Sequence, residues 1–270
     1  MGRGRRRGAG VLALVWLFTL GGGLTTALAE PGYEDLRPRW KGARTAQLRF
    51  VTVTPPKQAT KGGCPVAPAL PTAPVTAAHA LGRSVTVYSA PDGSQTHRLA
   101  NPTRDHQRLH LRVLEQRRGW LHVMLPVRPN GTTGWIRTGD VSRSGVPTRI
   151  LVEKCAKRLT LFRGDEVLMR ETVAIGKPAS PTPAGEFYVD FTFRFQPFSA
   201  AYGPAMISVA GFSEVLKSFH GAIPQIAIHG TRAQWSIGKP ASNGCVRMRN
   251  DAAVALSQLV LPGTPVTIVA

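Results

Sequence analysis

The fold of this chain is indicated by two neighbouring segments, Ile226-Ala227-Ile228-His229-Gly230-Thr231 and Ser242-Asn243-Gly244-Cys245-Val246-Arg247-Met248. The first is an apolar strand that ends in His229, and the second places Cys245 directly after a glycine. A thiol with an ordinary pKa of about 8.5 is mostly protonated at neutral pH, so a nucleophilic cysteine needs a nearby imidazole. Small Gly244 lets a backbone N–H approach an acyl oxygen, and the Cys245 N–H is a second candidate donor for such an oxyanion hole. On spacing alone an alternative stays open, in which Cys245 is a buried small residue and His229 merely ends a strand.

Outward from these segments, the sequence from residue 149 onward has the pattern of short β-strands. Strands are expected at residues 150–155, 158–162, 167–175, 185–191 and 265–269. Two short helices are expected, at residues 213–219 and 250–260, and Asn250 can cap the second. This part of the chain is therefore predicted to be mostly β, with two short helices.

Several blocks of sequence in this region resemble the catalytic domain of L,D-transpeptidases, the YkuD family. The blocks are Ile175-Gly176-Lys177, Pro181-Thr182-Pro183-Ala184-Gly185-Glu186-Phe187, Tyr202-Gly203-Pro204, His229-Gly230-Thr231, the segment from Ser242 to Met248, and Leu261-Pro262-Gly263-Thr264-Pro265-Val266. The resemblance covers residues 149–270 and implies a β-sandwich-like fold with short helices. It also implies a cysteine acyltransferase that forms L,D cross-links between peptidoglycan stem peptides through a Cys thioester. It implies no cofactor and no metal.

Carried over residue by residue, the resemblance makes Cys245 the nucleophile and His229 the base, with the Gly230 carbonyl orienting the imidazole. The oxyanion and substrate-binding positions that it implies are Gly244, Asn243, Ser242, Arg247 and Tyr202. Many family members have His where this chain has Asn243, which puts a proton-transfer role at that position in doubt but not the nucleophile. His220 is a rival base; we favour His229 because it ends a strand, where its direction is fixed.

Residues 77–146 contain a second series of short strands separated by turns. Strands are expected at residues 84–88, 109–113, 120–125 and 134–136. The motifs Gly119-Trp120 and Gly134-Trp135-Ile136 resemble bacterial SH3-like domains of envelope proteins, which implies a small SH3-like β-barrel before the catalytic domain. Trp120 and Trp135 are candidates for a ligand platform, but we interpret them as core aromatics.

The N-terminal segment has the features of an export signal. Residues 1–29 combine a cluster of arginines, an apolar stretch over 11–20 and the small-residue cleavage site Ala27-Leu28-Ala29. Residues 30–76 are rich in Pro, Thr and Ala and are expected to form a linker. The mature protein is therefore expected in the cell envelope, in a periplasm-like space or the cell wall, and an uncleaved signal would anchor it to the membrane.

The chain is strongly basic, with 34 Lys and Arg against 15 Asp and Glu and a net charge of +19. Anionic wall polymers are therefore candidate partners besides the stem peptides. Nucleic acid is not expected as a partner, because an exported chain rarely meets it. We expect a monomer. Two alternatives to cross-linking stay open: an L,D-carboxypeptidase, in which water resolves the thioester, and a non-catalytic cell-wall-binding protein.

The three cysteines are informative because an exported protein rarely leaves a thiol without a use. A disulfide between Cys64 and Cys155 would keep both away from the reactive Cys245 and would staple the linker to the catalytic domain. The closed loop would span the whole 77–146 unit, so the chain-entropy model gives a stabilisation on the order of 4 kcal/mol. The alternative, two unpaired cysteines, stays open because the residues around Cys64 fix no register.

Overall fold

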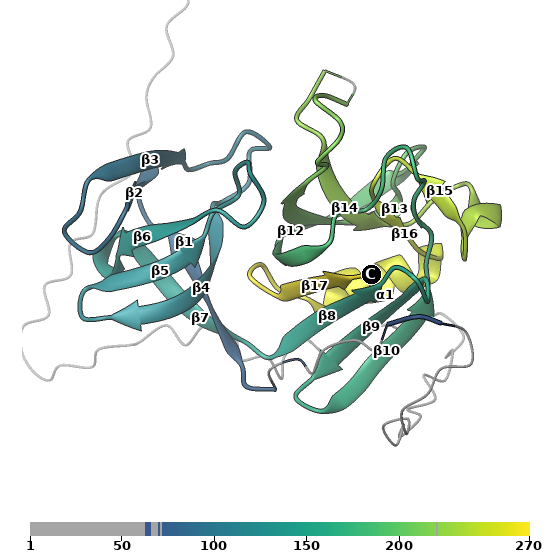
Figure 1. Cartoon of the computed structure of the whole chain (residues 1–270), viewed down its shortest axis with the longest axis horizontal. Coiled ribbons are helices and arrows are strands. Elements are labelled where there is room, and N and C mark those ends of the chain that lie inside the picture. The colour runs from purple at the N-terminus through teal and green to yellow at the C-terminus, as the bar shows by residue number, and fades with distance from the viewer. Residues whose placement is uncertain (1–62, 66–69, 71, 220) are drawn as a thin grey trace, which may run out of the picture. The chain divides into compact units, whose positions relative to one another are not determined.

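The computed structural model describes residues 63–65, 70, 72–219 and 221–270. The predicted signal peptide, residues 1–29, and most of the predicted linker, residues 30–76, lie outside the described residues. Within the described part, no helix is long and apolar enough to cross a membrane. The predicted fold class is confirmed, because the described residues are mostly β (Figure 1).

The first part of the chain forms a seven-stranded sheet of order β3-β2-β6-β5-β4-β1-β7. Its strands are β1 (Val75–Ala80), β2 (Ser84–Tyr88), β3 (Gln95–Ala100), β4 (His110–Arg117), β5 (Trp120–Met124), β6 (Thr133–Arg137) and β7 (Val141–Val146). Alternate residues of β2 are buried, as expected for a strand with one face on a core, and this places Val85 and Val87 beside Leu111 and Leu121.

This first sheet is open, so the closed barrel expected from the sequence is not formed. Its edge strands are β3 and β7, and they do not pair with each other. The middle of β7 and most of β3 are exposed, with polar side chains such as Arg98 and Arg143, and charged side chains are typical of edges that face solvent. The likeness of this part to SH3 domains stays a prediction.

The second part of the chain forms an eight-stranded sheet of order β10-β9-β8-β17-β12-β13-β14-β16. Its strands are β8 (Thr148–Glu153), β9 (Arg158–Arg163), β10 (Glu166–Thr172), β12 (Gly185–Ser199), β13 (Gly203–Phe212), β14 (Gln225–His229), β16 (Val246–Arg247) and β17 (Pro265–Val269). Two short strands, β11 (Ile175–Gly176) and β15 (Pro240–Ser242), pair with each other, and α1 (Asn250–Leu259) follows β16.

The long strand β12 belongs to both halves of this sheet. Its first residues, Gly185 to Tyr188, pair with β17, and from Val189 onward it pairs with β13, with a register shift between Val189 and Phe191. A single apolar core joins the two halves and includes Ile150 from β8, Ile207 from β13 and Leu256 from α1. Because β12 changes its pairing partner, one continuous sheet folds over its own core. Strands β14 and β16 lie at one edge of this sheet.

The sequence-based prediction of a helix at residues 213–219 is wrong. The chain turns there instead: the Ser213 Oγ accepts the Leu216 N–H, and Phe219 pairs with Ala222 in an isolated bridge. A helix of two turns is marginal without an apolar face to bury, and Val215 in this segment is 53% exposed. The predicted helix at 250–260 is confirmed as α1.

Candidate active site

Two neighbouring strands place His229 and Cys245 on one face of the sheet. Strand β14 ends at His229, and it runs parallel to β16 with Ile228 opposite Val246. Cys245 immediately precedes β16, beside Ala227, whose backbone N–H donates to the sulfur. Paired residues of neighbouring strands direct their side chains to the same face of the sheet. The thiol and the imidazole are therefore held on one face by backbone pairing.

The environment of His229 sets its tautomer. The side chain is 4% exposed, and its Nδ1 bonds to the carbonyl oxygen of Gly230. Because a carbonyl oxygen only accepts, Nδ1 carries the hydrogen, and the lone pair of the neutral ring is on Nε2. Burial lowers the pKa of His229 to about 4, helped by the charge of Arg247 and opposed by the bond to Gly230. The imidazole is thus a neutral base at neutral pH.

The Cys245 side chain is half-buried, and its thiol is free. Burial raises the pKa of this thiol, while the Ala227 N–H and the charge of Arg247 lower it. At neutral pH the Cys245 thiol and the His229 imidazole on the same sheet face are therefore both neutral.

Ser242 holds the loop that precedes Cys245. Its buried hydroxyl donates to the Cys245 carbonyl and accepts the Gly244 N–H at 3.1 Å. Gly244 itself has φ +118°, a conformation that strongly favours glycine. The Gly244 N–H is therefore directed at Ser242 and not at an acyl oxygen, contrary to its predicted oxyanion role. The Cys245 N–H meets no acceptor among the described residues, and its oxyanion role stays a prediction.

The other predicted residues surround this pair. The ring of Tyr202 meets the His229 imidazole edge-on, with centroids 5.1 Å apart. Burial, and after it the charge at Cys245, raises the pKa of the Tyr202 hydroxyl. Arg247 is half-buried opposite His229 on the neighbouring strand, and Asn243 is exposed on the nucleophile loop. The rival base, His220, lies outside the described residues.

Asn250 is a polar residue of this region whose contact the sequence did not reveal. No side-chain bond caps α1, and the Asn250 Oδ1 instead accepts the Thr231 N–H at 2.7 Å. The predicted capping role is therefore wrong. A local sequence pattern cannot signal a bond between residues 19 positions apart, because that bond depends on how α1 packs against β14.

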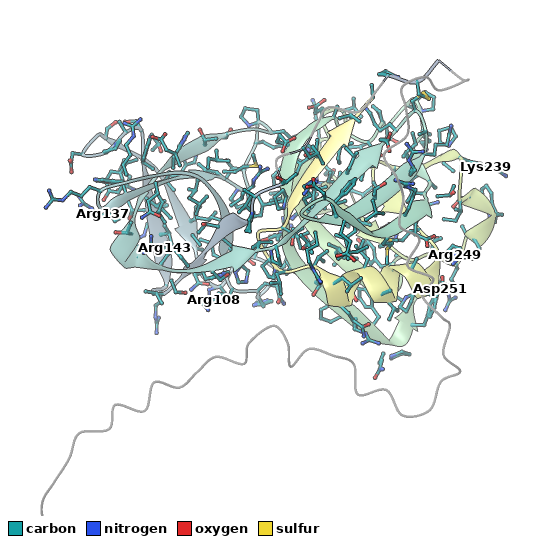
Figure 2. The ribbon with its side chains drawn as sticks, turned by 90° about the horizontal axis from the view of Figure 1, so that it is seen from below. Arg108, Arg137, Arg143, Lys239, Arg249 and Asp251 are labelled. Carbon is teal, nitrogen blue, oxygen red and sulfur yellow. A yellow bond between two sulfur atoms is a disulfide. The ribbon has the colours of Figure 1, made fainter. Side chains whose placement is uncertain are left out.

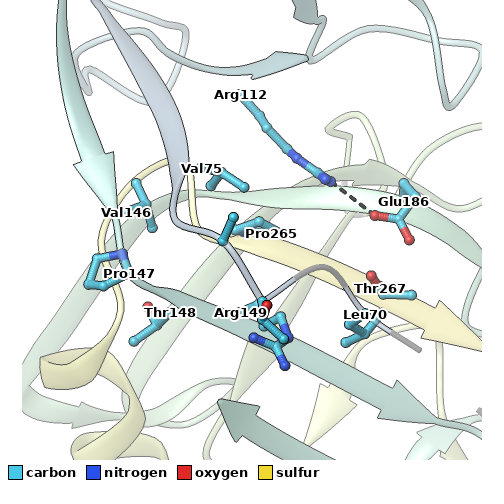
Figure 3. A pocket seen from close by; sticks show the side chains of 12 residues that line it. Leu70, Val75, Arg112, Val146, Pro147, Thr148, Arg149, Glu186, Pro265 and Thr267 are labelled. Carbon is cyan, nitrogen blue, oxygen red and sulfur yellow. Dashed lines mark hydrogen bonds and ion pairs between the residues drawn. The ribbon is translucent and has the colours of Figure 1, made fainter. Parts of the chain in front are cut away.

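Cys64 and Cys155 form a disulfide, and Cys155 lies in the turn between β8 and β9. Cys245 is left as the free thiol. A small cavity elsewhere, in Figure 3, lies where β7 passes into β8 and is lined by Val146, Pro147 and Arg149, with the Arg112–Glu186 ion pair at one end. Neither Cys245 nor His229 lines it, so it is separate from the candidate active site.

Comparison with known proteins gives a consistent result for the second part of the chain. Residues 147–268 match the model of the YkuD family, the L,D-transpeptidase catalytic domain. The putative L,D-transpeptidase YkuD of Bacillus subtilis is 36% identical over 123 residues, 46% of this chain and 66% of that protein. The putative L,D-transpeptidase YqjB of the same organism is 32% identical over 124 residues, 44% of this chain and 69% of that protein. The chain thus spans about two thirds of the length of these curated relatives.

Among solved structures, an L,D-transpeptidase from Mycobacterium smegmatis is similar to 59% of this chain and 82% of its own, with 18% identity and a TM-score of 0.37. The catalytic domain of an Enterococcus faecium L,D-transpeptidase is similar to 45% of this chain and 96% of its own, with 22% identity and a TM-score of 0.34.

Proposed function

The chain belongs to the L,D-transpeptidase family whose catalytic domain is named YkuD, and on that premise we propose that it cross-links peptidoglycan stem peptides by acyl transfer through Cys245. The observation that carries this proposal is the state of the neighbouring base. His229 is neutral and buried, and its Nδ1–H is engaged by the Gly230 carbonyl, so that Nε2 is free to accept a proton. This arrangement suits a base that activates an adjacent thiol.

In the first half-reaction the Cys245 sulfur attacks the carbonyl that links the L-centre of a diamino acid to a terminal D-Ala. The thiol proton passes to His229 Nε2, and the tetrahedral oxyanion receives a hydrogen bond from the Cys245 N–H. The C–N bond then breaks, His229 returns the proton to the departing amine of D-Ala, and a thioester remains on Cys245. The diamino acid is carried over from the family.

In the second half-reaction an amine of a neighbouring stem attacks the thioester. His229 accepts the proton of that amine, the C–S bond breaks, and the proton returns to the sulfur of Cys245. The product is an L,D cross-link, and the thiol is regenerated. Water in place of the amine would give L,D-carboxypeptidase activity, because the same thioester is then hydrolysed.

The experiment that tests this function is intact-mass analysis of the purified protein with a disaccharide-tetrapeptide. We expect an adduct equal to the substrate minus D-Ala, peptide mapping that places it on Cys245, and cross-linked dimer as the product. Release of tripeptide without dimer would assign hydrolysis instead of transfer. Absence of an adduct and of any product, with substrate intact, would contradict the acyl-enzyme mechanism.

We also propose that the mature chain acts in the cell envelope and binds anionic wall polymers through its first part. Three exposed arginines of that part, Arg108, Arg137 and Arg143, support this proposal and are labelled in Figure 2. Co-sedimentation with purified cell walls, before and after chemical removal of their anionic polymer, tests it. We expect binding that falls with added salt and with polymer removal, as charge attraction does. Equal binding to stripped walls would contradict this role.

A further inference from the structure

The peptide group between Gly230 and Thr231 connects the catalytic histidine to α1. Its carbonyl oxygen accepts the His229 Nδ1–H, and its N–H donates to the Asn250 Oδ1 at 2.7 Å. A trans peptide group is planar, with its C=O and N–H pointing in opposite directions. One rigid plane therefore has the imidazole at one edge and the Asn250 amide at the other.

Close packing leaves this peptide group no room to turn. A Cβ on Gly203, which has φ +67°, would lie 2.7 Å from the Gly230 carbonyl carbon and 2.8 Å from the Thr231 nitrogen. A Cβ on Gly230 would lie 2.5 Å from the Asn250 Oδ1 and 2.9 Å from Pro204 Cδ. Two glycines thus bring the β12–β13 turn, the peptide group and the Asn250 side chain into direct contact.

The Asn250 side chain is directed away from its own helix to make this bond. An Asn at a helix start commonly accepts an N–H of the first turn, and that bond is worth about 1 kcal/mol. Here α1 has no side-chain cap, and the Asn250 oxygen is bonded to Thr231 instead. The helix is anchored by Ala252, Ala253 and Leu256, which are buried in the core. Asn250 is therefore held on a rigid element.

We propose that Asn250 is a positioning residue for catalysis, which acts on His229 through the Gly230–Thr231 peptide group. The inference rests on the proposed function, in which His229 Nε2 accepts the thiol proton. By accepting the Thr231 N–H, Asn250 fixes the direction of the Gly230 carbonyl and polarises it, and a polarised carbonyl is a stronger acceptor. That carbonyl in turn keeps the hydrogen on Nδ1 and leaves Nε2 free for Cys245.

The proposal makes a directional prediction about the histidine itself. In Asn250→Ala the carbonyl is a weaker and less fixed acceptor, so the imidazole is expected to populate the Nε2–H tautomer as well as the Nδ1–H tautomer. The bond to Gly230 raises the pKa of His229, so weakening this bond should move the pKa below its value of about 4. General loosening of the site would do the opposite, because water entering around a buried histidine returns its pKa toward about 6.5.

The test uses the full chain with ring-15N-labelled histidine, and a His229→Gln sample assigns the signal. We expect a single Nδ1–H tautomer at His229 in the wild type, a mixture in Asn250→Ala, and recovery of the single tautomer in Asn250→Asp, whose carboxylate also accepts the Thr231 N–H. The matched control is Asp251→Ala, since Asp251 is the next residue of α1 and its side chain is 72% exposed. The control should keep the wild-type tautomer.

The second readout is the rate at which iodoacetamide alkylates Cys245 at neutral pH. Mutation of the partners that orient metal-bound histidines typically costs about 10- to 100-fold, and we expect a fall of similar size in Asn250→Ala and a smaller one in Asn250→Asp. A wild-type tautomer and rate in Asn250→Ala would overturn the inference. The inference would also be overturned if, in Asn250→Ala, the pKa of His229 rose toward 6.5 and the unfolding temperature fell. That pattern would mean that Asn250 has a purely structural role. If His229→Gln alkylates as fast as the wild type, the proposed function fails instead.

Discussion

Between Val75 and Val146 the buried side chains are hydrophobic, whereas all fourteen buried polar or charged side chains of the described residues lie between Thr148 and Thr267. Both regions are β-sheets over an apolar core, so the difference does not come from the type of secondary structure. Burying a polar group costs free energy unless its hydrogen bonds are satisfied. In the second region, the free-energy cost of burying polar groups is therefore expected to be offset by a role that these groups have.

Four of these buried polar residues, Thr182, His229, Thr231 and Ser242, form hydrogen bonds in the loops around Cys245 and His229. Ser242 fixes the loop that carries Cys245, and the Thr182 hydroxyl accepts the Gly176 N–H on the neighbouring β11. The Thr231 hydroxyl accepts the Ala233 N–H, and the His229 Nδ1 bonds to the Gly230 carbonyl. Buried polar groups thus fix the loops of the candidate active site in the second region, whereas the first region is stabilised by the burial of apolar side chains.

The largest expected effect comes from substituting Cys245, the proposed nucleophile. Such a variant should lose cross-linking activity but keep its fold. Cys245→Ala and Cys245→Ser should each reduce cross-linking by at least about 10⁴-fold, since alanine has no nucleophile and a serine hydroxyl is far less acidic. The matched change in the first region is Leu121→Ala, which should cost about 3 kcal/mol of stability while the folded fraction stays active. Turnover and urea unfolding of all three variants measure this. Clear cross-linking in either Cys245 variant would refute the assignment.

The next effect concerns the disulfide, which links the chain before the first region to the β8–β9 turn of the second. Cys64 and Cys155 are 91 residues apart, so their bond closes a loop around the entire first region. In the chain-entropy model the double variant Cys64→Ser/Cys155→Ser should lose about 4 kcal/mol of unfolding free energy. Urea unfolding without reductant compares the variant with the wild type, and a thiol count on the unfolded wild type should give one free thiol. Three free thiols would contradict the pairing.

Acid should destabilise the fold through two histidines with lowered pKa values, and one of them, His110, is a half-buried residue of the first region. His110 resembles His229 in that burial lowers its pKa to about 4, assisted by the charges of His79 and Arg108. An unfolded histidine has a pKa of about 6.5, so between pH 6.5 and 4 the unfolded chain binds more protons than the folded one. Stability is therefore lost as the pH falls through that window.

For fully buried His229 the loss amounts to about 3 kcal/mol by pH 4, and it should be smaller for His110, which is more exposed. Asp190 titrates with the opposite sign because burial raises its pKa to about 6, so wild type and variant must be compared at each pH. When urea unfolding is measured between pH 7 and 4.5, His229→Gln and His110→Gln should each show a smaller fall in the free energy of unfolding than the wild type. An unchanged slope in His229→Gln would contradict the buried neutral imidazole.

The local sequence pattern predicted the bounds of two strands correctly, one with a single buried face and one buried on both faces. The predicted strands at 84–88 and 265–269 have the observed bounds of β2 and β17. The extension of β12 to Ser199 was not predicted, because its partner changes from β17 to β13 at Val189 and a register shift between Val189 and Phe191 interrupts the alternation. Pairings between distant segments, which decide such extensions, leave no mark on the local sequence.

The site was predictable in its chemistry but not in its supports. The motifs around His229 and Cys245 pointed to a thiol and its base, and the structure brings both to one sheet face. Ser242 was predicted as an oxyanion or substrate-binding position, but the bond from the Gly244 N–H to its hydroxyl was not predicted. The bond from Asn250 to Thr231 was missed for a physical reason: a helix-start asparagine has a local option, capping, and only tertiary packing decides against it.

The smallest expected effect comes from a charged surface residue of the first region. Its substitution should change the free energy of unfolding only modestly. Arg117 lies over the Trp135 ring at 4.8 Å and bonds to Glu115, and its side chain is 58% exposed. An exposed cation over an aromatic ring is worth about 0.5–1 kcal/mol, and an exposed ion pair adds little. Arg117→Ala should therefore lower the unfolding free energy by about 0.5–1 kcal/mol relative to Arg118→Ala, which removes the same charge from the next, exposed residue. Urea unfolding of both variants measures the difference. A loss above about 2 kcal/mol would mean that Arg117 supports the core beneath it as a buried polar group does, and the contrast between the two regions would then no longer hold.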